Sequence, residues 1–208
     1  MVELSDAELQ YRIIYSIIVA GKNARFAEEK TKQLLKDMDY GETPFHTIGR
    51  WIAHISELLE LNITDMVLYK LRETKTGNYN KINKCLRELV CSNINLRTCS
   101  VEDLEKIYGI GPKTARFFIL WTRPNAKCAA LDVHVLRWLG KQGYKVPKST
   151  PNGKQYKELE QAFLDEADKL NMTPSELDKK IWVGSSNYGK KYGKWNPDDF
   201  VSIGEDLK

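Results

Sequence analysis

The segment from Leu104 to Arg116, LEKIYGIGPKTAR, constrains the fold more than any other part of the chain. It predicts the end of one helix, a turn with two glycines and the start of a second helix. Gly109 and Gly111 have no Cβ, so the backbone there can take a positive φ and lie close to a ligand. Pro112 suits the first position of the second helix, where a missing N–H costs nothing. The free N–H groups at that helix start favour the binding of a phosphate.

An amine and a carboxylate accompany this turn. Lys113 falls in the first turn of the second helix, and Asp132 follows nineteen residues later in the tetrapeptide LDVH, which ends at His134. A lysine beside such a turn can simply bind phosphate, and an aspartate before a helix can simply cap it. Together, an amine and a carboxylate next to a phosphate-binding turn indicate chemistry on a nucleic acid.

This arrangement resembles the helix-hairpin-helix DNA glycosylases (the HhH-GPD superfamily), which include endonuclease III and 8-oxoguanine DNA glycosylase. The family pattern is a hairpin L-P-G-[VI]-G-x-K-x-A, followed further along by V-D-x-H at the start of another helix. Here the hairpin reads IYGIGPKTA, with Tyr108 in place of the usual proline, and the second element reads LDVH. The resemblance implies that Lys113 is the nucleophile and Asp132 the essential carboxylate.

The chemistry of base excision gives these two residues distinct tasks. Breaking the bond between base and sugar builds positive charge on the sugar, which Asp132 can stabilise. Lys113 must be neutral to attack C1′ of the sugar, and we expect the helix dipole and neighbouring cations to lower its pKa. The attack forms a Schiff base, and β-elimination then cuts the strand. We therefore expect a bifunctional DNA glycosylase and AP lyase of base-excision repair, which flips and excises a damaged or modified base.

Positive charge is concentrated around the hairpin. Between Lys106 and Lys154 the chain has ten Lys or Arg residues and a single acid, Asp132. Such a concentration is typical of a phosphate-binding face, although it also suits a solvated lysine-rich surface. The residues of this part of the chain that we expect to contact DNA are Gly109, Gly111, Thr114, His134, Arg137, Lys145 and Lys148.

Two weaker resemblances lie nearer the N-terminus. Residues 17–25 (IIVAGKNAR) fall where the family has a helix ending in a polar loop that fills the gap left by the flipped base. Asn23, helped by Lys22, is the candidate for that role, unless these residues only end the first helix. Residues 76–82 (TGNYNKI) resemble the family's turn before the helix that leads to the hairpin. There Tyr79 is a candidate wedge beside the lesion or a half-buried core residue.

The cysteines argue against a metal cofactor. None of the four forms a C-x-x-C pair and none falls in the last eighty residues, where many relatives of endonuclease III hold an iron–sulfur cluster. We therefore expect no iron–sulfur cluster and no other metal. Free thiols and the lack of a signal-peptide pattern favour an intracellular protein. The expected partner is double-stranded DNA with a damaged or modified base. We expect a monomer and no membrane partner.

Helical patterns run along the whole chain, and no alternating run requires a sheet. The expected helices cover residues 5–19, 24–38, 47–61, 64–71, 79–90, 100–107, 112–122, 133–141, 155–170 and 173–183. The resemblance implies an all-α, two-domain HhH-GPD fold. A six-helix barrel would span residues 22–124, with the helix-hairpin-helix at about 100–116. The second domain would combine residues 1–21 with 125–208, of which 184–208 are expected to form a flexible tail.

Three functional hypotheses remain open at this level. The first is the bifunctional glycosylase. The second is a glycosylase-fold enzyme that modifies a base, like bacteriophage enzymes that attach an amino acid or amine to activated 5-hydroxymethyluracil in DNA. The third is a DNA-binding protein without catalysis, which would make the pairing of Lys113 with Asp132 a coincidence. No motif identifies the base that is recognised.

Overall fold

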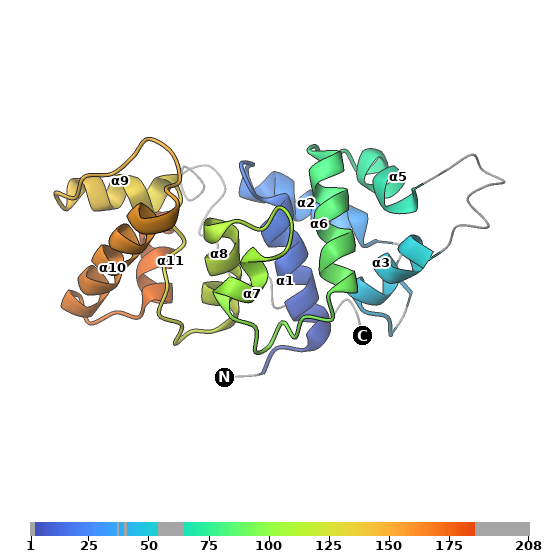
Figure 1. Cartoon of the computed structure of the whole chain (residues 1–208), viewed down its shortest axis with the longest axis horizontal. Helices are drawn as coiled ribbons and strands as arrows, with labels where there is room; N and C mark the ends of the chain where they lie inside the picture. The colour runs from blue at the N-terminus through green and yellow to red at the C-terminus, as the bar shows by residue number, and fades with distance from the viewer. Residues whose placement is uncertain (1–2, 37, 40, 54–64, 186–208) are drawn as a thin grey trace. The chain divides into compact units, whose positions relative to one another are not determined.

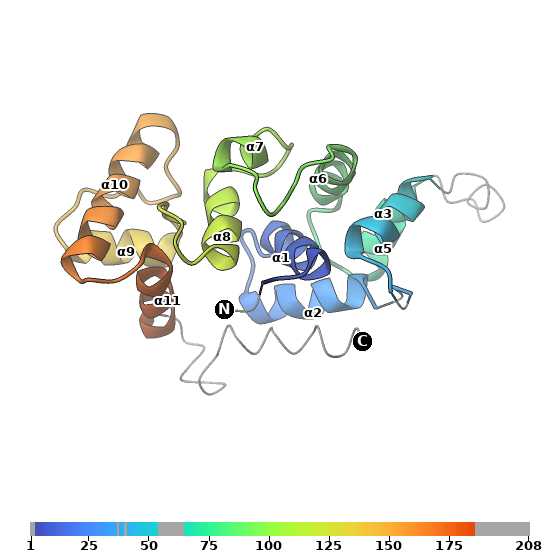
Figure 2. The ribbon, with the colours of Figure 1, turned by 90° about the horizontal axis from the view of Figure 1, so that it is seen from below.

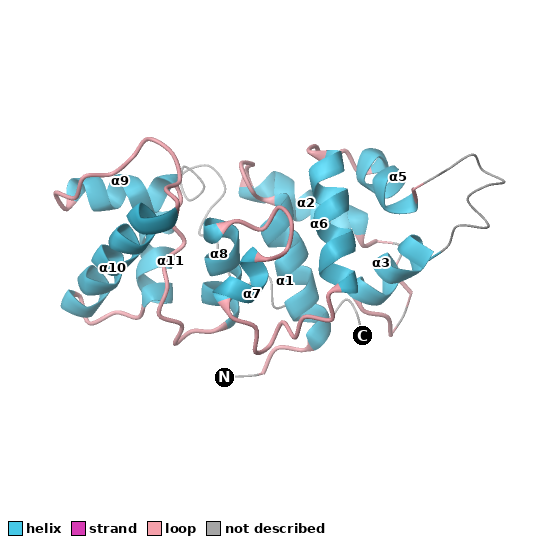
Figure 3. Cartoon of the chain, viewed as in Figure 1, coloured by secondary structure: helices cyan, strands magenta, loops and turns pink. Residues whose placement is uncertain are grey.

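The computed structural model describes residues 3–36, 38–39, 41–53 and 65–185, and every regular element within these ranges is a helix (Figure 3). This confirms the expected all-α class. The chain divides between Gly111 and Pro112 into two compact units, each with its own core.

The first unit is organised around one apolar helix. Its described helices are α1 (Asp6–Ile18), α2 (Ala24–Leu34), α3 (Pro44–Ala53), α5 (Met66–Glu73), α6 (Tyr79–Cys91) and α7 (Val101–Glu105) (Figure 1). Nine of the 13 residues of α1 are buried. Helices α2, α3 and α6 pack against α1, and the two views show α2 and α6 beside it (Figures 1 and 2). A capping box begins α1, because the Ser5 hydroxyl accepts from the Glu8 N–H and the Glu8 carboxylate accepts from the Ser5 N–H.

Two described helix ends in this unit differ from the sequence prediction by three residues or more, whereas the others differ by at most two. Helix α2 ends at Leu34 rather than at Met38. Beyond its end the chain forms a tighter turn, in which the Met38 N–H donates a hydrogen bond to the Leu35 carbonyl, three residues earlier. Helix α3 begins at Pro44 rather than at Thr47, since proline is well tolerated in a first turn. The predicted continuation of α3 beyond Ala53 lies outside the described residues.

The second unit contains α8 (Pro112–Thr122), α9 (Val133–Lys141), α10 (Gly153–Lys169) and α11 (Pro174–Ser185) (Figure 1). The bounds of α8 and α9 are those predicted from the sequence. Helix α11 packs against the other three helices of the unit. Its buried Leu177 and Ile181 join Leu131, Leu139 and Phe163 in one apolar core.

This division differs from the expected domain boundaries. The sequence predicts that residues 1–21 belong to the second domain, whereas α1 forms the centre of the first unit, because an apolar helix buried on most of its surface needs several neighbours. It also predicts that α8 belongs to the barrel, whereas α8 lies in the second unit. There the Ser175 hydroxyl donates to the Leu120 carbonyl at 3.2 Å and joins the start of α11 to α8.

None of the helices described is long and apolar enough to cross a membrane. The predicted tail begins at Gly184, but Gly184 and Ser185 are the last residues of α11. The rest of the predicted tail lies outside the described residues.

Candidate active site on the second unit

The two glycines of the hairpin differ in conformation. Gly109 takes a φ of +86°, and a Cβ there would come within 3.4 Å of Lys81 and Cys85 on α6. Gly111 does not take a positive φ, so that part of the prediction is wrong for Gly111. A Cβ on Gly111 would meet no atom within 4 Å. The described protein therefore leaves the backbone of Gly111 uncovered.

Tyr108 takes the place of the family's usual proline and gives the turn an additional donor. Its backbone N–H, which proline lacks, donates to Glu88 Oε1 at 3.1 Å. Tyr108 is 44% exposed, and the Lys84 ammonium lies 4.1 Å from the centroid of its ring. Tyrosine in place of proline therefore adds a hydrogen bond to the backbone of the turn and places an exposed aromatic ring under the Lys84 ammonium.

Lys113 lies at the second position of α8 and is half-buried. Its ammonium sits 4.7 Å from the centroid of the Phe117 ring, one helical turn further along, and Phe117 in turn stacks on Trp121. Burial lowers the pKa of Lys113, while the nearby carboxylates of Asp132 and Asp178 act in the opposite direction. The direction is the one expected from the sequence, but the main cause is burial and not neighbouring positive charge.

Asp132 is the N-cap of α9. Its Oδ1 accepts hydrogen bonds from the backbone N–H groups of His134 at 2.8 Å and Val135 at 2.9 Å. The capping role that the sequence left open is thus present. A cap fixes the rotamer of the carboxylate, so this role supports a catalytic task rather than competing with it.

A second carboxylate, Asp178, joins this pair and was not found from the sequence. It lies half-buried on α11, next to the buried Leu177. Burial and the charge of Asp132 raise the pKa of Asp178 to about 7, and Lys113 opposes that shift. Three helices of one unit therefore bring an amine and two carboxylates together. The only signal in the sequence was an acid within the apolar repeat of the last predicted helix.

The chain that leads into Asp132 is held by the side chains of α10. The Tyr156 hydroxyl donates to the Ala129 carbonyl at 2.7 Å and accepts from the Leu131 N–H at 3.1 Å. Glu160 Oε1 accepts from the Ala129 N–H at 2.9 Å. Both side chains form hydrogen bonds with the backbone directly before the N-cap residue Asp132, so they fix the position at which α9 begins.

Arg116 connects these hydrogen bonds to α8, the helix that carries Lys113. Its Nε and Nη2 donate to the two carboxylate oxygens of Glu160 at 2.6 and 3.1 Å. Its guanidinium also lies 4.5 Å from the centroid of the Tyr156 ring. Bidentate pairing of two nearly buried side chains is a geometrically strict contact. The network of Arg116, Tyr156 and Glu160 therefore sets the position of Asp132 relative to α8.

Replacing Tyr156 with phenylalanine tests this positioning. The variant keeps the ring below Arg116 but leaves the Ala129 carbonyl and Leu131 N–H without the hydroxyl, which costs about 1–3 kcal/mol of stability. We expect the rate of base release to fall about tenfold as Asp132 shifts, in line with the sensitivity of catalysis to small misplacements. The matched control is Tyr144→Phe, which removes a hydroxyl bonded to Glu166 in the same unit. Equal rates in the two variants would contradict the positioning role.

The other predicted DNA contacts of this unit fall into two groups. Arg137 on α9 is exposed, as are Lys145 and Lys148 in the loop between α9 and α10, and His134 is half-buried. Thr114 is only 7% exposed, so the structure offers little of this residue to DNA. The sequence could not show this, because the burial of Thr114 depends on the packing of α8.

The predicted residues of the first unit have structural contacts of their own. Lys22 Nζ donates to the Ile18 carbonyl at the end of α1 at 2.9 Å, and burial together with Lys81 lowers its pKa. Asn23 is the N-cap of α2, with Oδ1 accepting from the N–H groups of Arg25 and Phe26. Both residues therefore satisfy helix ends, which is the simpler of the two roles considered for them. A gap-filling role for either one stays a prediction.

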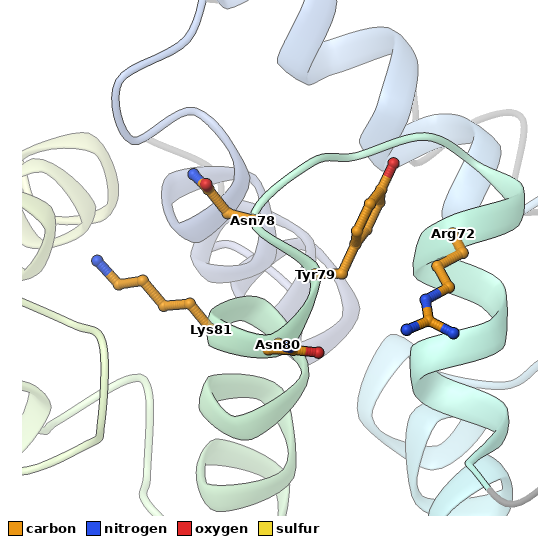
Figure 4. Close-up of a pocket in the computed structure, with 5 residues that line it drawn as sticks. All are labelled: Arg72, Asn78, Tyr79, Asn80 and Lys81. Carbon is orange, nitrogen blue, oxygen red and sulfur yellow. The ribbon is translucent and has the colours of Figure 1, made fainter.

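Tyr79 lines an open hollow of about 320 Å³ at the start of α6. Its ring stands between the start of α6 and α5, which carries Arg72 (Figure 4). The side chains of Asn78 and Lys81 point away from the ring (Figure 4). The remaining lining residue is Asn80. Tyr79 is half-buried, so the structure leaves both of its predicted roles open.

Cys85, Cys99 and Cys128 are buried free thiols and Cys91 is an exposed one. Among the described residues, no three His, Cys, Asp or Glu side chains are grouped so as to hold a metal ion. The expectation that no metal cofactor is used stays a prediction.

Comparison with known proteins identifies the fold. No protein-family model matches the sequence. The 8-oxoguanine DNA glycosylase of Thermotoga maritima superposes with a TM-score of 0.61 at 22% identity, over 90% of this chain and 82% of that one. The glycosylase/lyase of Methanocaldococcus jannaschii in complex with DNA containing 8-oxoguanine gives 0.58 at 21% identity, over 91% and 83%. The chain has the fold of 8-oxoguanine DNA glycosylases.

The uncomplexed M. jannaschii 8-oxoguanine DNA glycosylase matches similarly, with a TM-score of 0.59 at 22% identity, over 91% of this chain and 80% of that one. All three matches cover most of both chains. The all-α HhH-GPD fold expected from the hairpin and the LDVH element is thereby confirmed.

Proposed function

We propose that this chain is a DNA glycosylase with AP lyase activity that acts in base-excision repair. The observation that carries the proposal is the placement of Lys113 and Asp132 on the N-terminal ends of two helices in one unit, with the pKa of Lys113 lowered by burial. A lysine that serves only to bind phosphate has no need to be desolvated. A nucleophilic lysine does, because only the neutral amine attacks.

The proposed reaction assigns one step to each side chain. The lone pair of Lys113 Nζ bonds to C1′ of the flipped nucleotide while the bond from C1′ to the base breaks and its electrons leave with the base. The Asp132 carboxylate stabilises the positive charge that develops on the sugar. Opening of the sugar ring gives the Schiff base, and β-elimination then breaks the C3′–O bond of the strand.

Damaged duplex DNA is the proposed partner, with 8-oxoguanine as the leading substrate, because the solved structures that share this fold are named for that base. The proposed phosphate contacts are the uncovered backbone of Gly111, which directly precedes α8, and the exposed side chains of Arg137, Lys145 and Lys148.

Borohydride trapping tests the function directly. The chain is incubated with duplexes that contain 8-oxoguanine, an oxidised pyrimidine, an abasic site or no lesion, with and without borohydride. We expect a covalent adduct and strand cleavage on the 8-oxoguanine and abasic duplexes and none on undamaged DNA. Binding without base release or adduct on any duplex would contradict the proposal and favour a base-modifying or purely DNA-binding protein.

A further inference from the structure

One side of α6 contacts the hairpin turn and carries two lysines that the proposed function does not yet use. A Cβ on Gly109 would lie 3.4 Å from both Cε of Lys81 and Cβ of Cys85. Further along α6, the Lys84 ammonium lies 4.1 Å from the centroid of the Tyr108 ring. Residues three positions apart share one face of a helix, so Lys81 and Lys84 lie next to each other beside the turn.

The hairpin turn restricts both lysine side chains. The stem of Lys81 passes close to Gly109, because a Cβ on that glycine would contact its Cγ and Cε atoms. The Tyr108 ring attracts the Lys84 ammonium and limits where it can move. Side chains lose conformational freedom when they bind a partner, and those that are already ordered lose less. The two ammonium groups are therefore better prepared to bind an anion than lysines on an open surface.

Positive charge dominates this side of α6. Lys81 and Lys84 are exposed, and neither forms an ion pair with another residue of the described structure. Glu88 lies four residues beyond Lys84, but its Oε1 accepts a hydrogen bond from the Tyr108 N–H. The first turn of α6 contains no acid, and its N-cap Asn78 makes no capping hydrogen bond with its side chain. The positive end of the helix dipole therefore adds to the charge of Lys81.

We propose that Lys81 and Lys84 bind successive phosphates of one DNA strand beside the hairpin turn, and that Tyr108 positions Lys84 for this contact. This inference rests on the proposed function. Duplex DNA fits the surface because its phosphates recur at short, regular intervals along each strand, and each lysine supplies one positive charge. The usual proline at position 108 would supply neither the aromatic ring nor the N–H that Glu88 accepts.

The salt dependence of binding to undamaged duplex DNA tests the two contacts without any need for catalysis. Lys81→Gln and Lys84→Gln should each lower the affinity about eightfold at about 0.1 M salt and reduce the log–log salt slope by about 0.9, because each loses one phosphate contact. The double variant should reduce the slope by about 1.8. Lys36→Gln, the same change at an exposed position of the same unit, should keep the wild-type slope. Wild-type slopes in the Lys81 and Lys84 variants would overturn the proposal.

Substitutions of Tyr108 separate the position of the Lys84 ammonium from its charge. Tyr108→Leu keeps the backbone N–H but removes the ring, so the affinity should fall about two- to fivefold, the equivalent of an exposed cation–π contact. Tyr108→Phe keeps the ring and should bind as the wild type does. In the Lys84→Gln background, Tyr108→Leu should have no further effect, since the ring acts through the ammonium. An equal loss of affinity in both backgrounds would refute the positioning role.

Neutral phosphate analogues identify the contacts themselves. A duplex with a non-cleavable abasic-site analogue sets the register, and methylphosphonates replace its phosphates one at a time. At two successive positions of one strand, the replacement should weaken binding by the wild type. One of them should have no effect on Lys81→Gln and the other none on Lys84→Gln, because that contact is already lost. If every replacement weakens the variants as much as the wild type, the two lysines do not contact phosphate.

Comparison with borohydride trapping distinguishes failure of this inference from failure of the proposed function. A chain that shows the expected salt slopes but traps no DNA would bind DNA through α6 without excising a base. A chain that traps DNA while both lysine variants keep the wild-type slope would be a glycosylase whose α6 lysines do not contact DNA. Thermal unfolding of each variant confirms that it is folded.

Discussion

Replacement of Lys113 by glutamine is expected to abolish borohydride trapping and to lower the rate of base release by roughly 1000-fold or more, since loss of a nucleophile removes the covalent route. Binding to duplex DNA should remain largely intact. The amine is one of many positive groups along residues 106–154, and phosphate contacts are shared among them. The measurements are trapping and single-turnover cleavage on an 8-oxoguanine duplex, with binding by fluorescence anisotropy.

The variant should also remain folded. Its main structural loss is the contact of the ammonium with the Phe117 ring, which is worth about 0.5–1 kcal/mol for a partly exposed pair. Lys127→Gln is the matched control, because Lys127 is exposed, lies in the same basic segment and undergoes the same change of charge. Persistence of the covalent adduct in Lys113→Gln would assign the nucleophile to another amine. Loss of the adduct in both variants would point to a defect in DNA binding.

Replacement of Asp132 by asparagine is expected to slow base release by about 100- to 1000-fold with little effect on lesion binding or stability. Asparagine caps helices about as well as aspartate, so the hydrogen bonds to His134 and Val135 can be kept. Only the negative charge is lost, and with it the stabilisation of the developing positive charge on the sugar, a contribution of about 3–4 kcal/mol. The rate is measured under single-turnover conditions and the stability by urea unfolding.

A second substitution at the same position separates charge from capping. Asp132→Ala removes both, so it should lose activity to a similar extent and also destabilise the protein by about 1 kcal/mol. If Asp132→Asn releases base at a near-normal rate while Asp132→Ala is unstable, Asp132 is a cap without a catalytic role.

The local structure of the site could be predicted well from the sequence. The bounds of α8 and α9, the capping box of α1 and the N-cap at Asp132 all depend on residues within a few positions of one another. Pro112, Ser5 and Asp132 act on the backbone of their own helices, so their effect is visible in the order of residues alone. The motif spacing also identified the pairing of Lys113 with Asp132, because both lie in short elements with strong signals.

The groups that complete the site depend on which helices pack together. Asp178 lies 46 residues after Asp132 in the chain and belongs to the site only because α11 packs against α8 and α9. The hydrogen bonds of Tyr156 and Glu160 with the backbone of Ala129 likewise connect residues that are 27 and 31 positions apart. Contacts between residues so far apart depend on which apolar helix faces pack together. The sequence pattern shows that a helix has an apolar face, but it does not show which other helix covers that face.

The distinction between features set by neighbouring residues and features set by helix packing applies to the whole of the described structure. The sequence by itself determined the helical class, most helix ends and the candidate pair of Lys113 and Asp132, because these follow from backbone hydrogen bonding and residue spacing. Only the tertiary structure decided that α1 centres the first unit, that Thr114 is buried and that burial raises the pKa of Asp178. These properties depend on burial, because helices that pack together cover side chains, and the exclusion of water then shifts the pKa of a buried group. Burial exists only once the helices have packed.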